Sequence, residues 1–327
     1  MRYSVVVPVY NGERFIREAL DSVLNQTHKV DEIVVYDDCS TDSSVSVVSS
    51  YGSSVRLVRG AGGPSGFVNG WNKAIACALS EYVSILHQDD VLYPRYFEEV
   101  EAVLQRYPDI RHVFSVCDYI DEQSIITDRF PEMPERIVRY SFNEYVAAYQ
   151  REYGVFPHIH RCPGVVTHRS IFEKDGCCYQ AEAGHIADDD FFYRVGQYTD
   201  AAGILVSCAA YRQHRYSATG VLEDLQMTTR LFRDYSYQVR QWSTSQSLGK
   251  AEKYYFEYWA LRYAFRSLAG ALKQQDKELF NDIALSFRDL KGLLSRQSGT
   301  GFKISALECS TRLLGFERMA ELLRKHA

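Results

Sequence analysis

The stretch Ile33-Val34-Val35-Tyr36-Asp37-Asp38-Cys39-Ser40-Thr41-Asp42 runs from a short apolar segment directly into an acidic loop. Consecutive apolar residues rich in β-branched side chains are typical of a strand that is buried on both faces of a sheet. The acidic loop follows at the carboxyl end of that strand, which is where ligands bind in open α/β sheets. The stretch therefore predicts an α/β fold with a polar site at the strand ends.

The flanking segments continue this alternation of strands and helices. Val5-Val6-Val7 predicts the preceding strand, and residues 12–26 place apolar side chains at helical spacing. Residues 67–79 predict another helix, which leads into a strand over residues 82–86. Strands that alternate with helices over short connections predict a Rossmann-like, mostly parallel sheet flanked by helices.

Two acidic pairs lie at the carboxyl ends of the predicted strands. Asp37-Asp38 follows the second strand, and Asp89-Asp90 follows the strand over residues 82–86. Because the carboxyl ends of parallel strands meet at one edge of a sheet, we expect these pairs to lie close together. Carboxylates supply the oxygen ligands that Mg²⁺ and Mn²⁺ prefer, although an isolated acidic pair more often caps a helix or lies in a solvated turn. The combination of both pairs favours a metal-dependent site.

The pattern changes near residue 220. Residues 112–215 mix strand and helix patterns, whereas residues 222–327 carry only helical stripes of apolar side chains. The stripes are Tyr258, Leu261, Phe265, Leu268 and Leu272, then Leu279, Ile283, Phe287, Leu290 and Leu294, then Ile304 to Leu323. We predict a catalytic domain over residues 1–220 and an α-helical domain over residues 221–327, each long enough to bury its own core.

Composition narrows the class of protein further. No stretch reaches the roughly 18 uncharged apolar residues of a membrane-spanning helix, and the N-terminus lacks the features of a secretory signal. The eight cysteines include no C-x-x-C pair, so neither a zinc knuckle nor a redox motif is indicated. We expect a cytoplasmic protein, with peripheral attachment at the inner face of the cell membrane as an alternative, and no nucleic-acid partner.

Several short segments together resemble the family 2 glycosyltransferases of the GT-A fold in order and spacing. The first three are Pro8-Val9-Tyr10-Asn11-Gly12, Asp37-Asp38-Cys39-Ser40-Thr41-Asp42 and Leu86-His87-Gln88-Asp89-Asp90. The middle one is similar to the family's D-D-x-S-x-D signature. Three more are Trp71-Asn72-Lys73-Ala74, Asp188-Asp189-Asp190-Phe191-Phe192-Tyr193-Arg194, similar to E-D-x-D-L-x-x-R, and Tyr211-Arg212-Gln213-His214, similar to Y-R-x-H. The resemblance covers residues 3–220 and leaves the helical end unexplained.

The resemblance implies roles for individual residues. The donor-binding residues would be Pro8, Val9, Tyr10, Asp38, Asn72 and Asp89, and the metal ligands would be Asp90 and His214. Asp188 aligns with the family's catalytic base because Arg194 follows it by six residues, and Asp189, one position further on, is the alternative. Two positions depart from the family's pattern, since His87 stands where the family often has Asp and Ala187 where it often has Glu.

The resemblance also implies an activity. An inverting enzyme of this family moves a sugar from a nucleotide diphosphate, usually UDP, to an acceptor hydroxyl with Mn²⁺ or Mg²⁺ as cofactor. The acceptor would be a glycan or a lipid-linked glycan in surface polysaccharide biosynthesis. Two other classes stay open: a sugar-nucleotide nucleotidyltransferase, whose Gly-rich basic loop is replaced here by Tyr10-Asn11-Gly12-Glu13, and a non-catalytic protein of the same fold that binds nucleotide sugars.

Three explanations are open for the helical end. Residues 222–327 carry 17 Lys and Arg against 12 Asp and Glu, whereas residues 1–221 carry 20 against 30. The mildly basic, amphipathic segment Lys303–Lys325 is compatible with contact with a membrane surface, and the aromatic residues of Tyr254–Trp259 with formation of a homodimer. Burial in a helical core of its own is the explanation that we favour for Tyr258 and Phe265.

Overall fold

The computed structural model describes residues 1–131, 133–141, 144, 162–174, 177–217, 224–243 and 250–294, and near the C-terminus residues 307, 311 and 316–319, with the side chains of 224, 250–252, 254 and 255 excepted. The chain divides into two compact units. Residues 1–181 and 188–214 form the first, which we call the α/β unit, and residues 182–187 and 215–327 form the second, the helical unit. The predicted boundary between residues 220 and 221 lies outside the described residues and stays a prediction.

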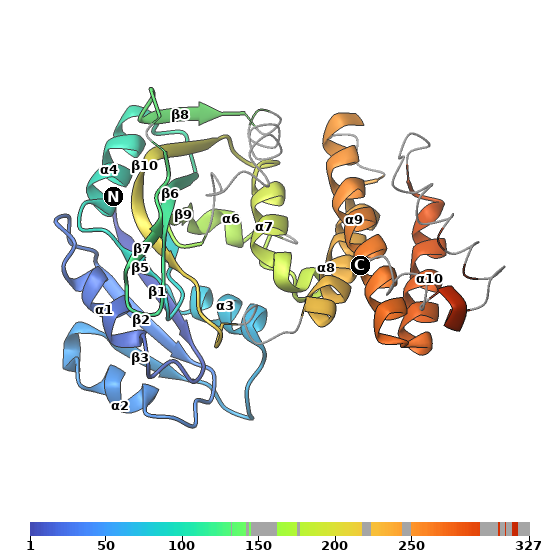
Figure 1. The fold of residues 1–327 in the computed structure, drawn as a ribbon. Coiled ribbons are helices and arrows are strands. Elements are labelled where there is room, and N and C mark those ends of the chain that lie inside the picture. Colours follow the sequence, from blue (N-terminus) through green and yellow to red (C-terminus); the bar gives the residue numbers. More distant parts are fainter. Residues whose placement is uncertain are drawn as a thin grey trace. The chain divides into compact units, whose positions relative to one another are not determined.

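The α/β unit is built on one ten-stranded sheet (Figure 1). Its strands are β1 (Tyr3–Val9), β2 (Glu32–Asp37), β3 (Arg56–Arg59), β4 (Tyr82–Ile85), β5 (Val91–Leu92), β6 (His112–Ile120), β7 (Ile126–Asp128), β8 (Ile137–Tyr140), β9 (Val165–His168) and β10 (Ala201–Arg212). The order is β3-β2-β1-β4-β9-β6-β10-β5, with β7 beside β6 and β8 beside β10. The four N-terminal strands are parallel, as are β6 and β10.

The helices cover both faces of this sheet. They are α1 (Ile16–Leu24), α2 (Ser44–Ser49), α3 (Phe67–Ala76), α4 (Tyr96–Arg106), α6 (Arg169–Phe172) and α7 (Ala187–Val195). All seven residues of β1 are buried, and alternate ones, Val5 and Val7, belong to the same core as Leu20 of α1 and Phe97 of α4. Helix α3 packs against β1 and β2. This two-sided burial explains why the N-terminal strands are continuously apolar.

One antiparallel strand interrupts the parallel arrangement. Strand β9 lies between β4 and β6 and runs antiparallel to both. Inside the sheet, His112 Nδ1 of β6 lies 2.9 Å from Thr167 Oγ1 of β9, and burial lowers the pKa of His112 to about 3. The imidazole is therefore neutral and links the two strands in the interior.

The helical unit contains α8 (Asp224–Trp242), α9 (Lys250–Gln274) and α10 (Lys277–Lys291). Their buried apolar side chains include Phe232 and Tyr235 of α8, Leu261 and Leu268 of α9, and Ile283 and Phe287 of α10. The predicted burial of Tyr258 is wrong because this side chain is 37% exposed, and Phe265 is half-buried. The leucines of the predicted stripe, Leu261, Leu268 and Leu272, are fully buried, and Trp259 is buried in place of Tyr258. Most of Lys303–Lys325 lies outside the described residues.

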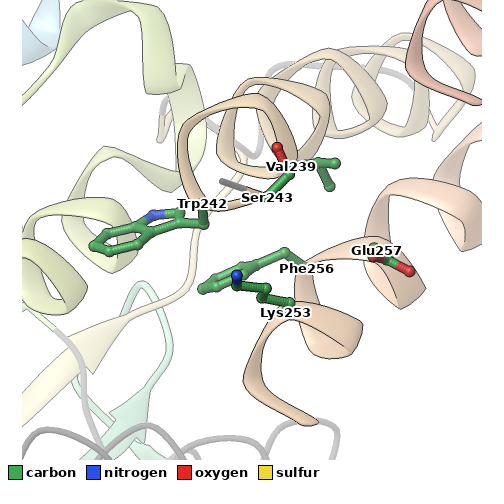
Figure 2. Close-up of a pocket in the computed structure, with 6 residues that line it drawn as sticks. All are labelled: Val239, Trp242, Ser243, Lys253, Phe256 and Glu257. Carbon is green, nitrogen blue, oxygen red and sulfur yellow. The ribbon is translucent and has the colours of Figure 1, made fainter. Parts of the chain in front are cut away.

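A small cavity lies inside the helical unit between α8 and α9 (Figure 2). Trp242 and Phe256 stack beside it with ring centroids 6.2 Å apart, and Lys253 and Glu257 line its rim. Within the described ranges, no helix is long and apolar enough to cross a membrane.

Candidate active site

The turn after β1 is held by a glutamine from the turn after β4. The backbone N–H of Tyr10 donates to Gln88 Oε1 at 2.9 Å, and Gln88 Nε2 donates to the carbonyl of Tyr10 at 3.3 Å. A side chain at Gly12 would collide with this glutamine. The Tyr10 ring is 46% exposed. The predicted donor-binding segment Pro8–Tyr10 is thus tied to the predicted metal-binding turn while its aromatic ring stays open to solvent.

The turn after β2 presents a buried carboxylate. Asp38 accepts hydrogen bonds from the backbone N–H of Ser65 at 2.7 Å and from the Ser65 hydroxyl at 2.8 Å, and Lys73 Nζ lies 3.9 Å from its Oδ1. Asp38 therefore fixes the loop ahead of α3, using one acceptor direction of each oxygen. A carboxylate has about four acceptor directions, so further contacts are available to a ligand.

Asn72 of α3 is engaged with a distant backbone segment. Its Nδ2 donates to the carbonyl of Tyr179 at 2.7 Å, and the N–H of Tyr179 donates back to its Oδ1 at 3.0 Å. The neighbouring Trp71 stacks on His87, with ring centroids 4.7 Å apart and planes at 24°. The structure thus places Asn72 in a clamp on Tyr179, and its role in donor binding stays a prediction.

The turn after β4 carries the predicted metal ligands. Asp89 Oδ2 lies 2.8 Å from His214 Nε2, and Asp90 Oδ1 accepts from the backbone N–H of Arg212 at 2.9 Å. Asp90 is 1% exposed, and its Oδ2 lies 3.8 Å from His87 Nδ1. Residues from the ends of β4 and β10 therefore meet here, although they are more than a hundred positions apart in the sequence.

The three consecutive aspartates of α7 have different surroundings. Asp190 is 1% exposed and accepts from Arg194 Nε at 2.8 Å, and burial raises its pKa although Arg194 opposes that rise. Asp189 is 8% exposed. Asp188 is partly exposed and accepts only a backbone hydrogen bond from Asp189, at 2.9 Å, among the contacts found in the described residues. Of the three, Asp188 is the one most open to a substrate.

The charge of Asp188 acts on side chains that the carboxylates of the β4 turn also affect. Burial lowers the pKa of His87, and the charges of Asp89 and Asp188 both act on this ring in the opposite direction. Burial raises the pKa of the Cys162 thiol well above its ordinary value, and the charges of Asp188 and Asp90 add to that rise. The charge of Asp188 therefore acts on His87 together with Asp89, and on Cys162 together with Asp90.

The donor atoms of this site suit a divalent cation that is shared with a phosphate ligand. In the described part of the chain, no group of three His, Cys, Asp or Glu side chains lies close enough to hold a metal alone. Mg²⁺ and similar cations are commonly held by one or two carboxylates, with substrate phosphates and water as the other ligands. Asp90 and Asp89 offer such carboxylates, and His214 adds a nitrogen next to Asp89. The residues present fit a cation of this kind.

Several residues that position the site carried no assigned role in the sequence analysis. They are Gln88, Ser65, Tyr179, Trp71 and Arg212. Gln88, Trp71 and Arg212 lie inside recognised segments, so their positions in those segments were the available signal. Tyr179 acts through backbone groups that any residue carries. Ser65 uses its hydroxyl as well as its backbone N–H, but it lies outside every recognised segment.

The sheet order, the carboxylates at its edge and the appended helices define a GT-A fold. Against known families, a match to the one described as Glycosyl transferase family 2 covers residues 4–173. The chain therefore belongs to glycosyl transferase family 2. This confirms the predicted family and fold class, whereas the roles of individual residues stay predictions.

Curated relatives match about a third of the chain. An uncharacterized glycosyltransferase of Rickettsia typhi is 37% identical over 123 residues, which cover 37% of this chain and 38% of that protein. The poly(ribitol-phosphate) β-N-acetylglucosaminyltransferase TarS of Staphylococcus aureus is 32% identical over 114 residues, which cover 33% of this chain and 19% of that protein. The matches therefore span well under half of these relatives.

Solved structures resemble the chain over its whole length. Residues 1–349 of S. aureus TarS in complex with UDP-GlcNAc superpose with a TM-score of 0.67 at 15% identity, covering 100% of this chain and 91% of that chain. The mannosyltransferase PcManGT of Pyrobaculum calidifontis, in complex with GDP-Man and Mn²⁺, gives a TM-score of 0.55 at 17% identity, covering 98% and 84%. At these identities the likeness supports the fold alone.

Proposed function

We propose that this protein is an inverting, metal-dependent glycosyltransferase that moves a sugar from a UDP-linked donor to an acceptor hydroxyl. The observation that carries the proposal is that Asp89 and Asp90 lie together with His214 and His87 at the turn after β4, and that the charge of Asp188 also acts on His87. A partly exposed carboxylate beside a metal-binding carboxylate pair is the arrangement that base-assisted displacement of a diphosphate requires. Family membership and the nucleotide-sugar complexes of the structural neighbours agree with it.

The donor's nucleoside would bind at the ends of β1 and β2. The backbone of Pro8 to Tyr10 and the Asp38 carboxylate line this edge, and the exposed Tyr10 ring offers a face for a base. A bound divalent cation, held by Asp90 with Asp89 and His214, would neutralise charge on the diphosphate leaving group. Asp90 and His214 take their predicted roles as metal ligands, Asp89 adds to them from the predicted donor-binding residues, and Asn72 acts through the Tyr179 clamp.

The chemical step assigned to the chain itself is proton transfer. The acceptor oxygen attacks the anomeric carbon from the side opposite the diphosphate, so that the new carbon–oxygen bond forms as the bond to UDP breaks. Asp188 accepts the hydroxyl proton as this happens, and the electron pair of the broken bond leaves with UDP. General-base assistance of this kind contributes about 10²–10⁴-fold in rate. Direct displacement inverts the anomeric configuration.

Titration of UDP by calorimetry tests the proposal without knowledge of the acceptor. We expect binding that is tighter with Mn²⁺ than with EDTA, and we expect Asp90→Ala to abolish that difference. Asp109→Ala is the matched control because Asp109 is an exposed carboxylate paired with Arg139 outside the site. Equal affinity in Mn²⁺ and EDTA for the unaltered protein would contradict metal dependence. Release of pyrophosphate in place of UDP during turnover would indicate the nucleotidyltransferase alternative.

We also propose that the acceptor is a glycan or a lipid-linked glycan of a surface polysaccharide, and that the helical unit contacts the membrane surface at the inner face of the cell membrane. The support is the excess of basic residues in 222–327 and the exposed Leu285 beside Arg288 on α10. Flotation with anionic vesicles at low salt tests this contact. No association would count against it, and a dimeric mass by light scattering would favour self-association.

A further inference from the structure

Arg212 is the largest fully buried charged side chain of the α/β unit. It is the last residue of β10, and its side chain is 0% exposed. Burying a guanidinium is costly unless its N–H groups are paired. The side chain donates from Nε to the carbonyl of Asp89 at 2.8 Å, from Nη1 to the carbonyl of Asp121 and the hydroxyl of Ser124 at 2.9 Å each, and from Nη2 to Glu18 Oε2 at 2.6 Å.

Two hydrogen bonds of Arg212 act directly on the predicted metal-binding turn. The guanidinium holds the carbonyl of Asp89, and the backbone N–H of Arg212 holds Asp90 Oδ1 at 2.9 Å. The planar guanidinium fork fixes the direction of the hydrogen bond to Asp89, and the backbone of β10 fixes the one to Asp90.

The same arginine also connects to His214, the other predicted metal ligand. Its guanidinium lies over the Phe15 ring at 4.7 Å, and the centroid of that ring lies 4.7 Å from the centroid of the His214 ring. In the sequence, a single residue, Gln213, separates Arg212 from His214. Arg212 therefore holds the carbonyl of Asp89 and the carboxylate of Asp90 directly, and it reaches the His214 ring through Phe15.

We infer that Arg212 is a positioning residue that orients the Asp89-Asp90 turn and His214 toward a divalent cation and the donor diphosphate. The inference rests on the proposed function. It assigns no contact between Arg212 and substrate, because the side chain is buried beneath the turn. Groups that orient metal ligands typically change metal affinity or activity by about 10–100-fold when they are replaced.

The test measures how strongly Mn²⁺ improves UDP binding. In the full chain we expect Arg212→Lys, which keeps the charge but loses the fork, to reduce the ratio of the Kd in EDTA to the Kd in Mn²⁺ by about tenfold or more. Uridine, which has no phosphate, should bind the variant as it binds the unaltered protein. Arg139→Lys is the matched control. The Arg139 guanidinium likewise donates to carboxylates, those of Asp109 and Asp200, but near the start of β10.

An unchanged ratio in Arg212→Lys would overturn the inference. Equal weakening of uridine and UDP, with and without Mn²⁺, would also overturn it and would indicate a general structural role. Should Arg212→Lys fail to fold, Glu18→Ala replaces it, because Glu18 is 42% exposed and accepts from Arg212 Nη2 and from the Ser124 hydroxyl that Nη1 contacts. We expect Glu18→Ala to reduce the ratio of the Kd in EDTA to the Kd in Mn²⁺ by a smaller factor. An unchanged ratio in this variant would contradict the positioning role of Arg212. Mn²⁺-independent UDP binding by the unaltered protein would instead overturn the proposed function itself.

Discussion

At the residue scale, the three aspartates of α7 differ in burial and partner, which makes the assignment of the base testable. We expect Asp188→Asn to lower kcat by about 10²–10⁴-fold, because the amide cannot accept the acceptor proton. The Kd for UDP with Mn²⁺ should stay near that of the unaltered protein. Steady-state kinetics with a transferable donor, together with calorimetry, provide both quantities.

Asp189→Asn is the control for that substitution. Asp189 is adjacent in the sequence but 8% exposed, so its replacement should leave kcat within a few-fold of the unaltered value. If Asp189→Asn abolished turnover and Asp188→Asn did not, the base would be Asp189, one position along α7.

Spacing in the sequence identified the acidic residues but could not identify their partners. Asp190 lies on the same short segment as Asp188, but its carboxylate accepts a hydrogen bond from Arg194. Residues four positions apart on a helix, such as Asp190 and Arg194, lie on the same face. Asn72 was assigned to the donor, whereas its amide clamps the backbone of Tyr179. The contact between Asn72 and Tyr179 joins residues 107 positions apart. It depends on the backbone groups of Tyr179, which no pattern of side chains encodes.

At the element scale, the interior contact between β6 and β9 predicts a pH dependence. The pKa of His112 is lowered by burial from its ordinary 6.5 to about 3, so between these values the unfolded chain binds a proton that the folded chain does not. The contribution of His112 to stability is therefore fully present above pH 6.5 and is lost progressively as the pH falls toward 3. At pH 5 the loss is about 2 kcal/mol.

His112→Asn removes this titration while keeping a polar side chain beside Thr167. We expect the free energy of unfolding to fall less between pH 7.5 and pH 5 in the variant than in the unaltered protein, by roughly the same 2 kcal/mol. Urea denaturation at the two pH values measures it. Parallel pH dependence in the two proteins would show that His112 is not the titrating group.

The strands and helices of the first 90 residues could be predicted because each carries its own periodic pattern. Strand β10 could not, since much of its sequence is alanine and glycine, which have low strand propensity, and its pairing with β6 and β8 is what makes it a strand. Helix α4 was not predicted either, although Tyr96, Val100, Val103 and Leu104 fall at helical spacing and are buried. That signal was present in the sequence.

At the scale of the whole molecule, the division into two units predicts two unfolding transitions. Each unit has its own buried apolar core, and the proposed donor site is built entirely from the α/β unit. A ligand stabilises only the state that binds it, by about 2.7 kcal/mol at a concentration one hundred times its Kd. UDP with Mn²⁺ should therefore raise the melting temperature of one transition in calorimetry and leave the other unchanged.

Gly184 allows the second transition to be assigned to the helical unit. Its φ is 58°, and an added side chain would collide with Asp234 Oδ1 of α8, so Gly184→Ala should destabilise this unit by about 1–2 kcal/mol or more. Gly292→Ala is the matched control, because Gly292 has a φ of −67° and no atom near the position of an added side chain. We expect Gly184→Ala to lower only the transition that UDP leaves unchanged. A single transition that the ligand and Gly184→Ala both shift would instead mean that the two units unfold as one cooperative body, because a two-state unit responds as a whole to any change in it.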